Sequence, residues 1–340
     1  MKVVLDVFGA DEKPDIIIDG ALLAIKEDSE LSIALSGNAD IVLPILKNKS
    51  ADMSRIEIID AKDIITNDDS PTTAFKQKKE SSLIKGLQAL KDRDDLVAFV
   101  SAGSTGAVLA GATFIIKRIP GVLRPALAPF LPTATDGQVC LIDAGSNVDC
   151  KPEYLAQFAI LGAAYMQAAN KIEKPAIGLV SVGAEDKKGN ELTKAAFSLL
   201  KEMPINFKGN TEARYALTGD FDVLVCDGFI GNVLLKSVEG TAKLFSQKLR
   251  QTIKASFLAK IGYAIFMRGA FRRLKDSMDY QKHGGAPFLG VEKVVIKCHG
   301  SSKATAIKAA LLQAKTIAKA GLIEKIKEGI NAGNQLQIQE

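Results

Sequence analysis

Short apolar runs rich in β-branched residues alternate with longer amphipathic stretches along this chain, and each run ends in glycine or small polar residues. Apolar runs followed at once by helical patterns are typical of strands that lead into helices through short turns. Such alternation predicts a mostly parallel sheet with helices on both faces and its turns along one edge. We therefore expect a layered αβα fold over residues 1–340, as one large unit or as two lobes, with a site assembled from several turns. The runs are VVLDVFGAD (3–11), LVAFVSAGSTGAVLAGA (96–112), VCLIDAGSNVDC (139–150), GLVSVGAEDKKGN (178–190) and GDFDVLVCDGFIGNVLLKSVEG (219–240).

The last of these runs has the clearest turn. An apolar segment at 223–225 predicts a buried strand, Gly228 and Gly231 break it, and an amphipathic segment with Lys236 follows. Glycine lets backbone amides approach a ligand, and a helix N-terminus favours an anion, so this turn favours phosphate as its ligand. A plain strand-to-helix connection has the same pattern, and that alternative stays open.

Composition narrows the class of protein. With 340 residues, 47% of them hydrophobic, the chain can bury a large core. The only histidines are His283 and His299, and the four cysteines form no CxxC pair, so we expect no metal and favour cysteines that pack as small apolar residues in a reducing compartment. The sequence starts directly with a strand pattern and has no export signal, which predicts a cytoplasmic protein.

Two long uncharged segments invite comparison with membrane spans. Residues 97–116 contain a polar glycine turn, whose backbone would be unsatisfied in lipid, and therefore predict a strand, a turn and a buried helix. Residues 154–170 contain two glutamines and predict a core helix or a helix at a subunit contact.

A basic segment departs from the rest of the chain. Residues 250–275 carry seven lysines and arginines and no acidic residue, interleaved with apolar side chains at helical spacing. We expect a protruding helical hairpin over about 238–278 that contacts an anionic membrane surface, the partner subunit of a dimer, or both. Nucleic acid is a weaker alternative because no nucleic-acid module accompanies the basic residues. The expected membrane-contact residues are Phe257, Leu258, Ile261, Ile265 and Phe266.

Polar residues at the turn edge supply candidate chemistry. Lysines before a helix, here Lys187 and Lys188, suit an anion. A carboxylate or amide at a strand end, here Asp143 or Asn147, can orient a ligand. Each of these residues also has a plain structural explanation, such as a helix cap, a solvated lysine or a charged helix face. The turns contain no GxGxxG, GxxxxGK[ST] or GxSxG, so a nicotinamide fingerprint, a Walker loop and a nucleophile elbow have no support.

In their order and spacing, the motifs resemble those of the bacterial PlsX family of phosphate acyltransferases from the first strand to about residue 310. The motifs that carry the resemblance are DVFGAD with Pro14, SAGSTGA, RPALA, DAGSNVDC, GAEDKKGN, NFKGN with Glu212, DVLVCDGFIGNVLLKSVEG, GGAPFLG and KCHGSS. The chain departs from the family pattern at Phe8, Ala10, Lys76, Ser146 and Ala213.

The resemblance implies transfer of a long acyl chain from acyl carrier protein to inorganic phosphate, without a cofactor, on a fold like that of phosphotransacetylases and isocitrate or isopropylmalate dehydrogenases. It implies a homodimer at the inner face of the cell membrane that supplies acyl phosphate to a glycerol-3-phosphate acyltransferase. Lys188, Asn232 and His299 are the expected catalytic residues, with His299 placed for proton transfer to the leaving sulfur. The expected phosphate- and substrate-binding residues are Ser101, Ser104, Asp143, Asn147, Lys187, Gly228, Gly231, Lys236 and Ser301.

Two alternatives belong to other classes of protein. An NAD(P)-dependent dehydrogenase of related fold lacks support from a nucleotide fingerprint or a metal-binding aspartate pattern. A non-catalytic lipid carrier or membrane scaffold would use the same basic helix, but it would leave the many polar glycine turns unexplained.

Overall fold

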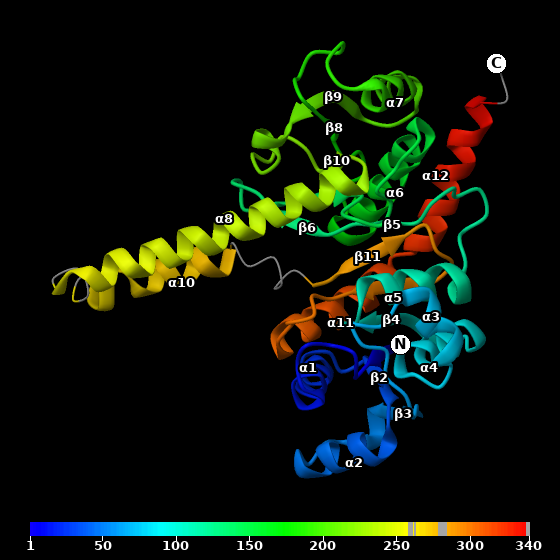
Figure 1. Ribbon diagram of the computed structural model, residues 1–340, viewed down its shortest axis with the longest axis vertical. Coiled ribbons are helices and arrows are strands. Elements are labelled where there is room, and N and C mark those ends of the chain that lie inside the picture. Colours follow the sequence, from blue (N-terminus) through cyan, green and yellow to red (C-terminus); the bar gives the residue numbers. More distant parts are fainter. Residues whose placement is uncertain (258–260, 262, 278–283, 338–340) are drawn as a thin grey trace.

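The computed structural model describes residues 1–257, 261, 263–277 and 284–337. Within this part of the chain the strands form two sheets, one of seven strands and one of five, with helices packed around them (Figure 1).

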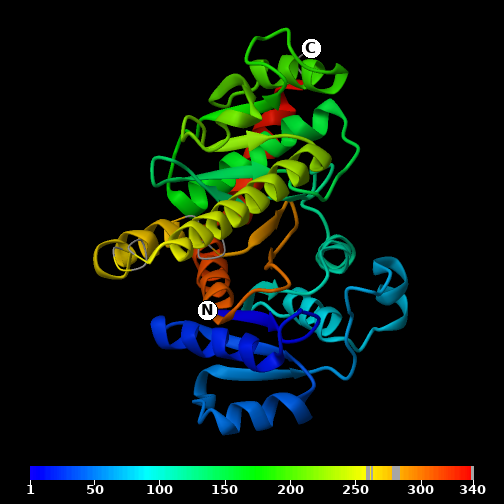
Figure 2. The same ribbon diagram turned by 60° about the vertical axis from the view of Figure 1, so that its left-hand side comes forward.

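The larger sheet joins both ends of the chain. Its strand order is β3-β2-β1-β4-β12-β11-β5, and the pairs from β3 to β12 are parallel whereas β11 is antiparallel to both of its neighbours. Figure 2 shows the C-terminal strands, in orange, beside the N-terminal ones. The strands are β1 (Lys2–Asp6), β2 (Ser32–Gly37), β3 (Ile56–Asp60), β4 (Leu96–Ser101), β5 (Ala126–Leu127), β11 (Ala286–Leu289) and β12 (Val294–Lys297).

The smaller sheet comes from the middle of the chain, in the order β6-β7-β10-β8-β9. Antiparallel pairing occurs between β6 and β7, and the remaining pairs are parallel, with Val223 opposite Cys140 on one side and Ile177 on the other. The strands are β6 (Phe130–Pro132), β7 (Gln138–Ile142), β8 (Ile177–Ser181), β9 (Phe207–Glu212) and β10 (Val223–Val225).

Helices cover both faces of the sheets, as side chains of β1 illustrate. Val3 and Leu5 belong to one hydrophobic core and Val4 to the other, because successive strand residues point to opposite faces. The predicted layered α/β fold with mostly parallel strands is confirmed. The helices are α1 (Pro14–Glu27), α2 (Ala39–Asn48), α3 (Pro71–Gln77), α4 (Ser82–Asp92), α5 (Thr105–Gly111), α6 (Pro152–Asn170), α7 (Glu191–Glu202), α8 (Gly228–Ala255), α10 (Arg268–Ser277), α11 (Ala304–Lys319) and α12 (Leu322–Gln337), with shorter or π-helical turns η1 (Met53–Arg55), η2 (Ala112–Ile116), η3 (Ala213–Tyr215) and η4 (Tyr263–Met267).

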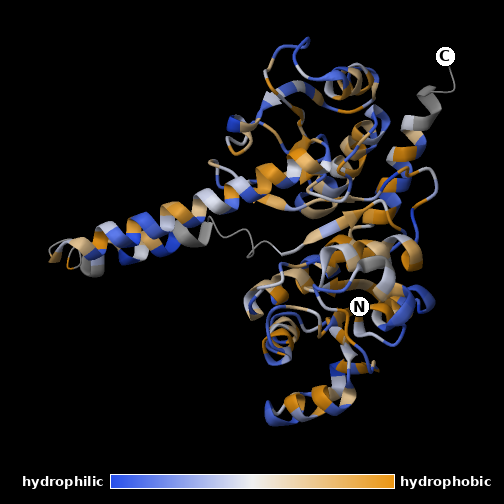
Figure 3. Cartoon of the chain, in the orientation of Figure 1, coloured by the Kyte–Doolittle hydropathy of each residue, from blue (hydrophilic) through white to orange (hydrophobic). Residues whose placement is uncertain are grey.

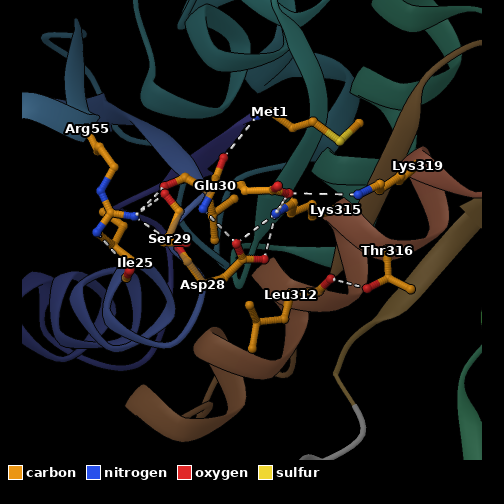
Figure 4. A network of polar contacts seen from close by, with 11 residues as sticks. Met1, Ile25, Asp28, Ser29, Glu30, Arg55, Leu312, Lys315, Thr316 and Lys319 are labelled. Carbon is orange, nitrogen blue, oxygen red and sulfur yellow. Dashed lines mark hydrogen bonds and ion pairs between the residues drawn. The ribbon is translucent and has the colours of Figure 1, made fainter.

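A polar network fastens α11 to the turn between α1 and β2 (Figure 4). The Lys315 ammonium lies 2.7 Å from each carboxylate oxygen of Asp28 and 3.2 Å from Glu30. The Arg55 guanidinium donates to four backbone carbonyls between Ile25 and Leu31. Burial of the Lys315 charge is therefore compensated by carboxylates, and α11 is fixed to the N-terminal part of the sheet.

The predicted protruding segment is an arm built on α8, whose second half extends away from the body with α10 alongside it (Figures 1 and 2). Polar and apolar residues alternate along the arm (Figure 3). Three of the five expected membrane-contact residues, Phe257, Ile261 and Phe266, are 75%, 41% and 80% exposed. Leu258 lies outside the described residues, and Ile265 lies in η4, where only its backbone is described. Of the helices in the described ranges, none is long and apolar enough to cross a bilayer.

Candidate functional site

A cleft of about 330 Å³ opens where the two sheets meet. Its walls come from the first turn of α5, the link between β5 and β6, the loop after β7, the first turns of α8, the residues leading into β11, and the loop after β12. Several turns that are distant in sequence are thus brought to one place, as the alternating pattern predicts. Among the lining residues that carry chemistry are Thr105, Asn232, Lys236, Glu239, Lys297, Cys298 and His299.

The link between the sheets is held by hydrogen bonds from the strand ends. The Leu127 backbone N–H donates to Asp143 Oδ1 over 2.9 Å, and its carbonyl accepts from the Ala144 N–H, also over 2.9 Å. The Ala128 N–H donates to the Pro287 carbonyl over 3.0 Å. One short segment therefore bonds both to the loop that follows β7 of the small sheet and to β11 of the large sheet.

Asp143 and Asn147 shape the loop after β7. Asp143 is buried, and its carboxylate accepts from the backbone N–H groups of Ser146 and Asn147 and from the Asn147 side chain. Burial raises the pKa of Asp143, and these hydrogen bonds oppose that shift. Asn147 also donates to the Pro125 carbonyl over 2.8 Å. The hydrogen bonds of Asp143 and Asn147 hold the loop in place. Their expected role in substrate binding stays a prediction.

The start of α8 packs directly on this loop. The Gly228 N–H donates to the Asn147 carbonyl over 2.7 Å, and a Cβ atom at Gly228 would lie 2.6 Å from that oxygen. Asp227 caps the helix by accepting from the Ile230 N–H over 2.8 Å. The glycines thus permit close contact between helix and loop, and this contact places Asn232 on the cleft wall beside Gly145.

The lining carries an excess of positive charge. Lys236 forms an ion pair with Glu239 over 2.8 Å on the same face of α8. Lys297, at the end of β12, is only 8% exposed, and its ammonium donates to the Cys298 carbonyl. Burial lowers the pKa of Lys297 because its charged form loses hydration. On the lining itself the two lysines outnumber the single glutamate, and the Asp11 carboxylate acts on Lys297 from outside it.

His299 and Ser301 form a small unit at the cleft mouth. The His299 Nδ1 atom lies 2.9 Å from Ser301 Oγ and accepts from the Ser301 backbone N–H over 3.3 Å, which leaves the proton of the neutral ring on Nε2. Partial removal from water, followed by the charge of Lys236, lowers the pKa of His299. The ring is therefore mostly neutral at pH 7 and offers an N–H donor.

Cys298 is one of the cleft residues with a potential nucleophile, beside the hydroxyl groups of Thr105 and Ser302. Its thiol is buried, which raises its pKa to about 12. A thiol of this kind stays protonated at neutral pH and reacts poorly. The cysteines at 140, 226 and 298 are buried, as expected for core residues, and in the described residues the four cysteines are all free.

Comparison with known proteins identifies the family. Residues 1–325 match the family model described as fatty acid synthesis protein. The phosphate acyltransferase of Clostridium perfringens is 46% identical over 331 residues, which is 97% of each chain. That of Clostridium acetobutylicum is 45% identical over 334 residues, covering 98% of this chain and 100% of the relative. The chain belongs to the PlsX family of phosphate acyltransferases. The family assignment expected from the motifs is confirmed, and with it an acyltransferase that uses phosphate and an acyl donor.

The fold of this phosphate acyltransferase resembles the folds of several solved structures. A phosphotransacetylase from Streptococcus pyogenes matches with a TM-score of 0.60 at 19% identity, over 94% of each chain. A 4-hydroxythreonine-4-phosphate dehydrogenase from Klebsiella pneumoniae matches with a TM-score of 0.53 at 11% identity, over 93% of this chain and 99% of that one. At these identities the likeness concerns the fold alone, and it confirms the expected resemblance to phosphotransacetylase-like and dehydrogenase-like folds.

The expected site residues of this acyltransferase fall into separate groups. Asn232, Lys236 and His299 line the cleft, and Ser301 contacts His299. Lys187 and Lys188 are exposed on the loop after β8 and are not part of the cleft lining, although Asn210 holds that loop through the Glu185 carbonyl. Their roles stay predictions.

The serines expected near the first glycine turns lie at the end of β4. Ser101 is buried and donates to Asp6 Oδ2 over 2.8 Å, while its own oxygen accepts from the Gly103 N–H over 3.0 Å. Burial, opposed by hydrogen bonds from Ser82 and Ser101, raises the pKa of Asp6 to about 6. Ser104 is the residue before α5, and its neighbour Thr105 reaches the cleft. The hydroxyl of Ser101 thus donates its hydrogen bond to the carboxyl group of Asp6.

Four polar residues with a hydroxyl, carboxylate or ammonium group line the cleft but were not among the site candidates: Thr105, Glu239, Lys297 and Ser302. Thr105 directly follows the expected Ser104, and Ser302 directly follows the expected Ser301. Lys297 belongs to the KCHGSS motif together with His299, and Glu239 follows Lys236 by three positions on α8. The sequence could have indicated these residues only through their position in or next to a motif, because the burial of a single lysine depends on tertiary packing.

Proposed function

We propose that the protein transfers a long-chain fatty acyl group from acyl carrier protein to inorganic phosphate and releases acyl phosphate and the free carrier. The observation that carries the proposal is the cleft itself, which combines an excess of positive charge, a neutral histidine and an amide at the junction of two sheets in a chain of this family. The two sheets would then act as lobes of one catalytic unit over residues 1–340. Product acyl phosphate suits a downstream glycerol-3-phosphate acyltransferase on the way to phosphatidic acid and phospholipid.

The reaction needs no covalent enzyme intermediate. A phosphate oxygen attacks the thioester carbonyl carbon, the carbonyl oxygen becomes negatively charged, and the carbon–sulfur bond then breaks to release the carrier thiolate, which takes up a proton. The protein has to hold the phosphate, support the oxyanion and supply that proton. Asn232 would orient phosphate or the carbonyl through its amide, and Lys236 and Ser301 would complete the anion site.

His299 would serve the leaving group. Its neutral ring offers an Nε2 hydrogen bond, and its protonated form can give a proton to the departing sulfur. Lys188, on its exposed loop, would contact phosphate or the oxyanion only if the substrate complex brings that loop to the cleft. We keep Lys188 and Lys187 as contacts to be tested on that basis.

The protein would act at the inner face of the cell membrane as a homodimer. The support for membrane contact is the arm, which combines exposed aromatic side chains with the basic segment at 250–275. An arm at the membrane would deliver a reactive lipid product directly to the bilayer. Packing of the arm against a partner subunit is compatible with the same surface.

Incubation with palmitoyl-acyl carrier protein, with and without phosphate, tests the proposal. Released carrier thiol is followed optically, and acyl phosphate is trapped as the hydroxamate. Phosphate-dependent hydroxamate in amounts that match thiol release is the expected result. Thiol release without phosphate dependence would indicate a thioesterase, and the absence of both signals would remove the proposed reaction.

A further inference from the structure

Two lysines of the protein are almost equally buried but differ in their partners. Lys315 is 7% exposed and is paired with Asp28 and Glu30, whereas Lys297 is 8% exposed and has no carboxylate partner in the described part of the chain. A buried ammonium that lacks an opposite charge is costly, so proteins retain one mainly where something else pairs with it. Lys297 is therefore the exception that needs an explanation.

The hydrogen bonds of Lys297 point the same way. A lysine ammonium has three donors, and the one acceptor seen for Lys297 in the described residues is the Cys298 carbonyl. The remaining donors belong to a residue that lines the cleft. Unused hydrogen-bond donors are therefore left on a residue of the cleft lining.

The residues around Lys297 favour an anion as the ligand. Lys236 is neutralised by Glu239, so the charge that remains in excess on the lining is that of Lys297. The Asp11 carboxylate acts on Lys297 from outside this lining and is itself bonded to Asn67. Burial lowers the pKa of Lys297, as expected for a cation whose partner is absent.

We propose that Lys297 binds the phosphate that accepts the acyl group, and that this phosphate is the ion-pair partner which the protein does not supply. The inference rests on the proposed function, in which inorganic phosphate is the acceptor. It places the principal anion contact on β12 rather than on the exposed loop of Lys187 and Lys188. A buried ammonium attracts phosphate more strongly than a solvated one, because water screens the charge less.

Thermal unfolding of the full-length protein with inorganic phosphate, against sodium chloride of equal ionic strength, provides the first test. Wild-type Tm should rise with phosphate. Lys297→Met should raise the Tm without phosphate by roughly 2 °C, because an unpaired buried charge is removed, and should abolish the phosphate-dependent rise. Lys315→Met, at the paired lysine, should lower the Tm, and Lys293→Met, near the opposite end of β12, should behave as wild type.

Kinetics provides the second test. Lys297→Met should raise the KM for phosphate by roughly 10- to 100-fold, because a charge-assisted contact is lost, and should leave the KM for palmitoyl-acyl carrier protein within about twofold. A lysine with a merely structural role would lower the Tm on substitution and leave both the phosphate-dependent rise and the phosphate KM unchanged, and that result would overturn the inference.

The two proposals can fail separately. If the wild-type enzyme is active and Lys297→Met has an unchanged KM for phosphate, the role of Lys297 is refuted and the proposed acyl-transfer reaction stands. A phosphate-dependent rise in Tm that Lys297→Met abolishes, in a wild-type protein that forms no hydroxamate, would leave the anion site and remove the acyl-transfer reaction.

Discussion

Gly231 on α8 faces the backbone of Asp143 so closely that a Cβ atom at Gly231 would lie 1.8 Å from the Asp143 carbonyl oxygen. Because the clashing oxygen belongs to the backbone, rotation of a side chain cannot relieve this contact. The helix that carries Asn232 and Lys236 into the cleft is therefore positioned by the absence of a side chain.

Gly231→Ala should destabilise the protein by about 3 kcal/mol or more and abolish acyl transfer, because α8 has to move away from the loop after β7. Urea unfolding and the hydroxamate assay measure the two effects. Gly240→Ala is a matched control on the same helix, where a Cβ would meet nothing within 4 Å. That control should gain up to about 1 kcal/mol from helix propensity, and a Gly231→Ala protein with wild-type stability would refute the packing argument.

Asp6→Asn should change how stability depends on pH. The pKa of Asp6 rises from 3.8 to about 6 on folding, so the folded state binds its proton more tightly. The stabilisation from that proton is complete below pH 3.8 and is lost as pH rises through 6. Between pH 4 and pH 8 the free energy of unfolding of Asp6→Asn should therefore rise relative to that of wild type by up to about 3 kcal/mol.

Urea titrations across this range measure the difference between Asp6→Asn and wild type. Asp94→Asn, at an exposed aspartate, is the control and should run parallel to wild type. A difference for Asp6→Asn that does not vary with pH would mean that Asp6 is already ionised in the folded protein at pH 4.

Much of this fold is predictable because its strands are local features. The apolar runs at 3–11, 139–150 and 219–240 became β1, β7 and β10, each followed by a turn and a helix as expected. The insertion of β12 between β4 and β11 is not local. Strand partners that are nearly 200 residues apart leave no periodic signal, because each strand has the same apolar pattern whichever neighbour it takes.

The site was less predictable than the fold for a related reason. Sequence singles out turns, but the reach of a turn into the cleft depends on which strands are adjacent. The turns at Asn232 and His299 line the cleft, and the turn at Lys188 follows β8, which is separated from β7 by β10. Burial likewise distinguishes Lys297 from its many exposed counterparts only once the sheets are packed.

His299 can be tested with two substitutions that separate its functions. Proton transfer to the leaving sulfur requires an ionisable ring, whereas a glutamine amide can replace only the Nε2 hydrogen bond. We expect both His299→Ala and His299→Gln to lower kcat by roughly 100-fold in the thiol-release assay. Recovery of near wild-type kcat in His299→Gln would contradict proton transfer and leave a hydrogen-bonding role.

The arm should mediate contact with anionic membranes. Replacing exposed Phe257 and Ile261 with glutamate adds negative charge and removes apolar contact, so the double variant should no longer sediment with vesicles that contain phosphatidylglycerol. Activity on palmitoyl-acyl carrier protein in solution should stay within about twofold of wild type. Vesicle binding that survives in the double variant would assign membrane contact to another surface.

The position of β12 also has a consequence for how the chain folds as it is made. Its neighbour β4 ends at Ser101, but β12 begins at Val294, so one edge of β4 waits unpaired while the whole smaller sheet is synthesised. At ribosomal rates of about 5–20 residues per second this interval lasts roughly 10–40 s. An open strand edge is a template for wrong pairing during that time. The last strand to emerge from the ribosome closes this edge and completes the cleft in the same step.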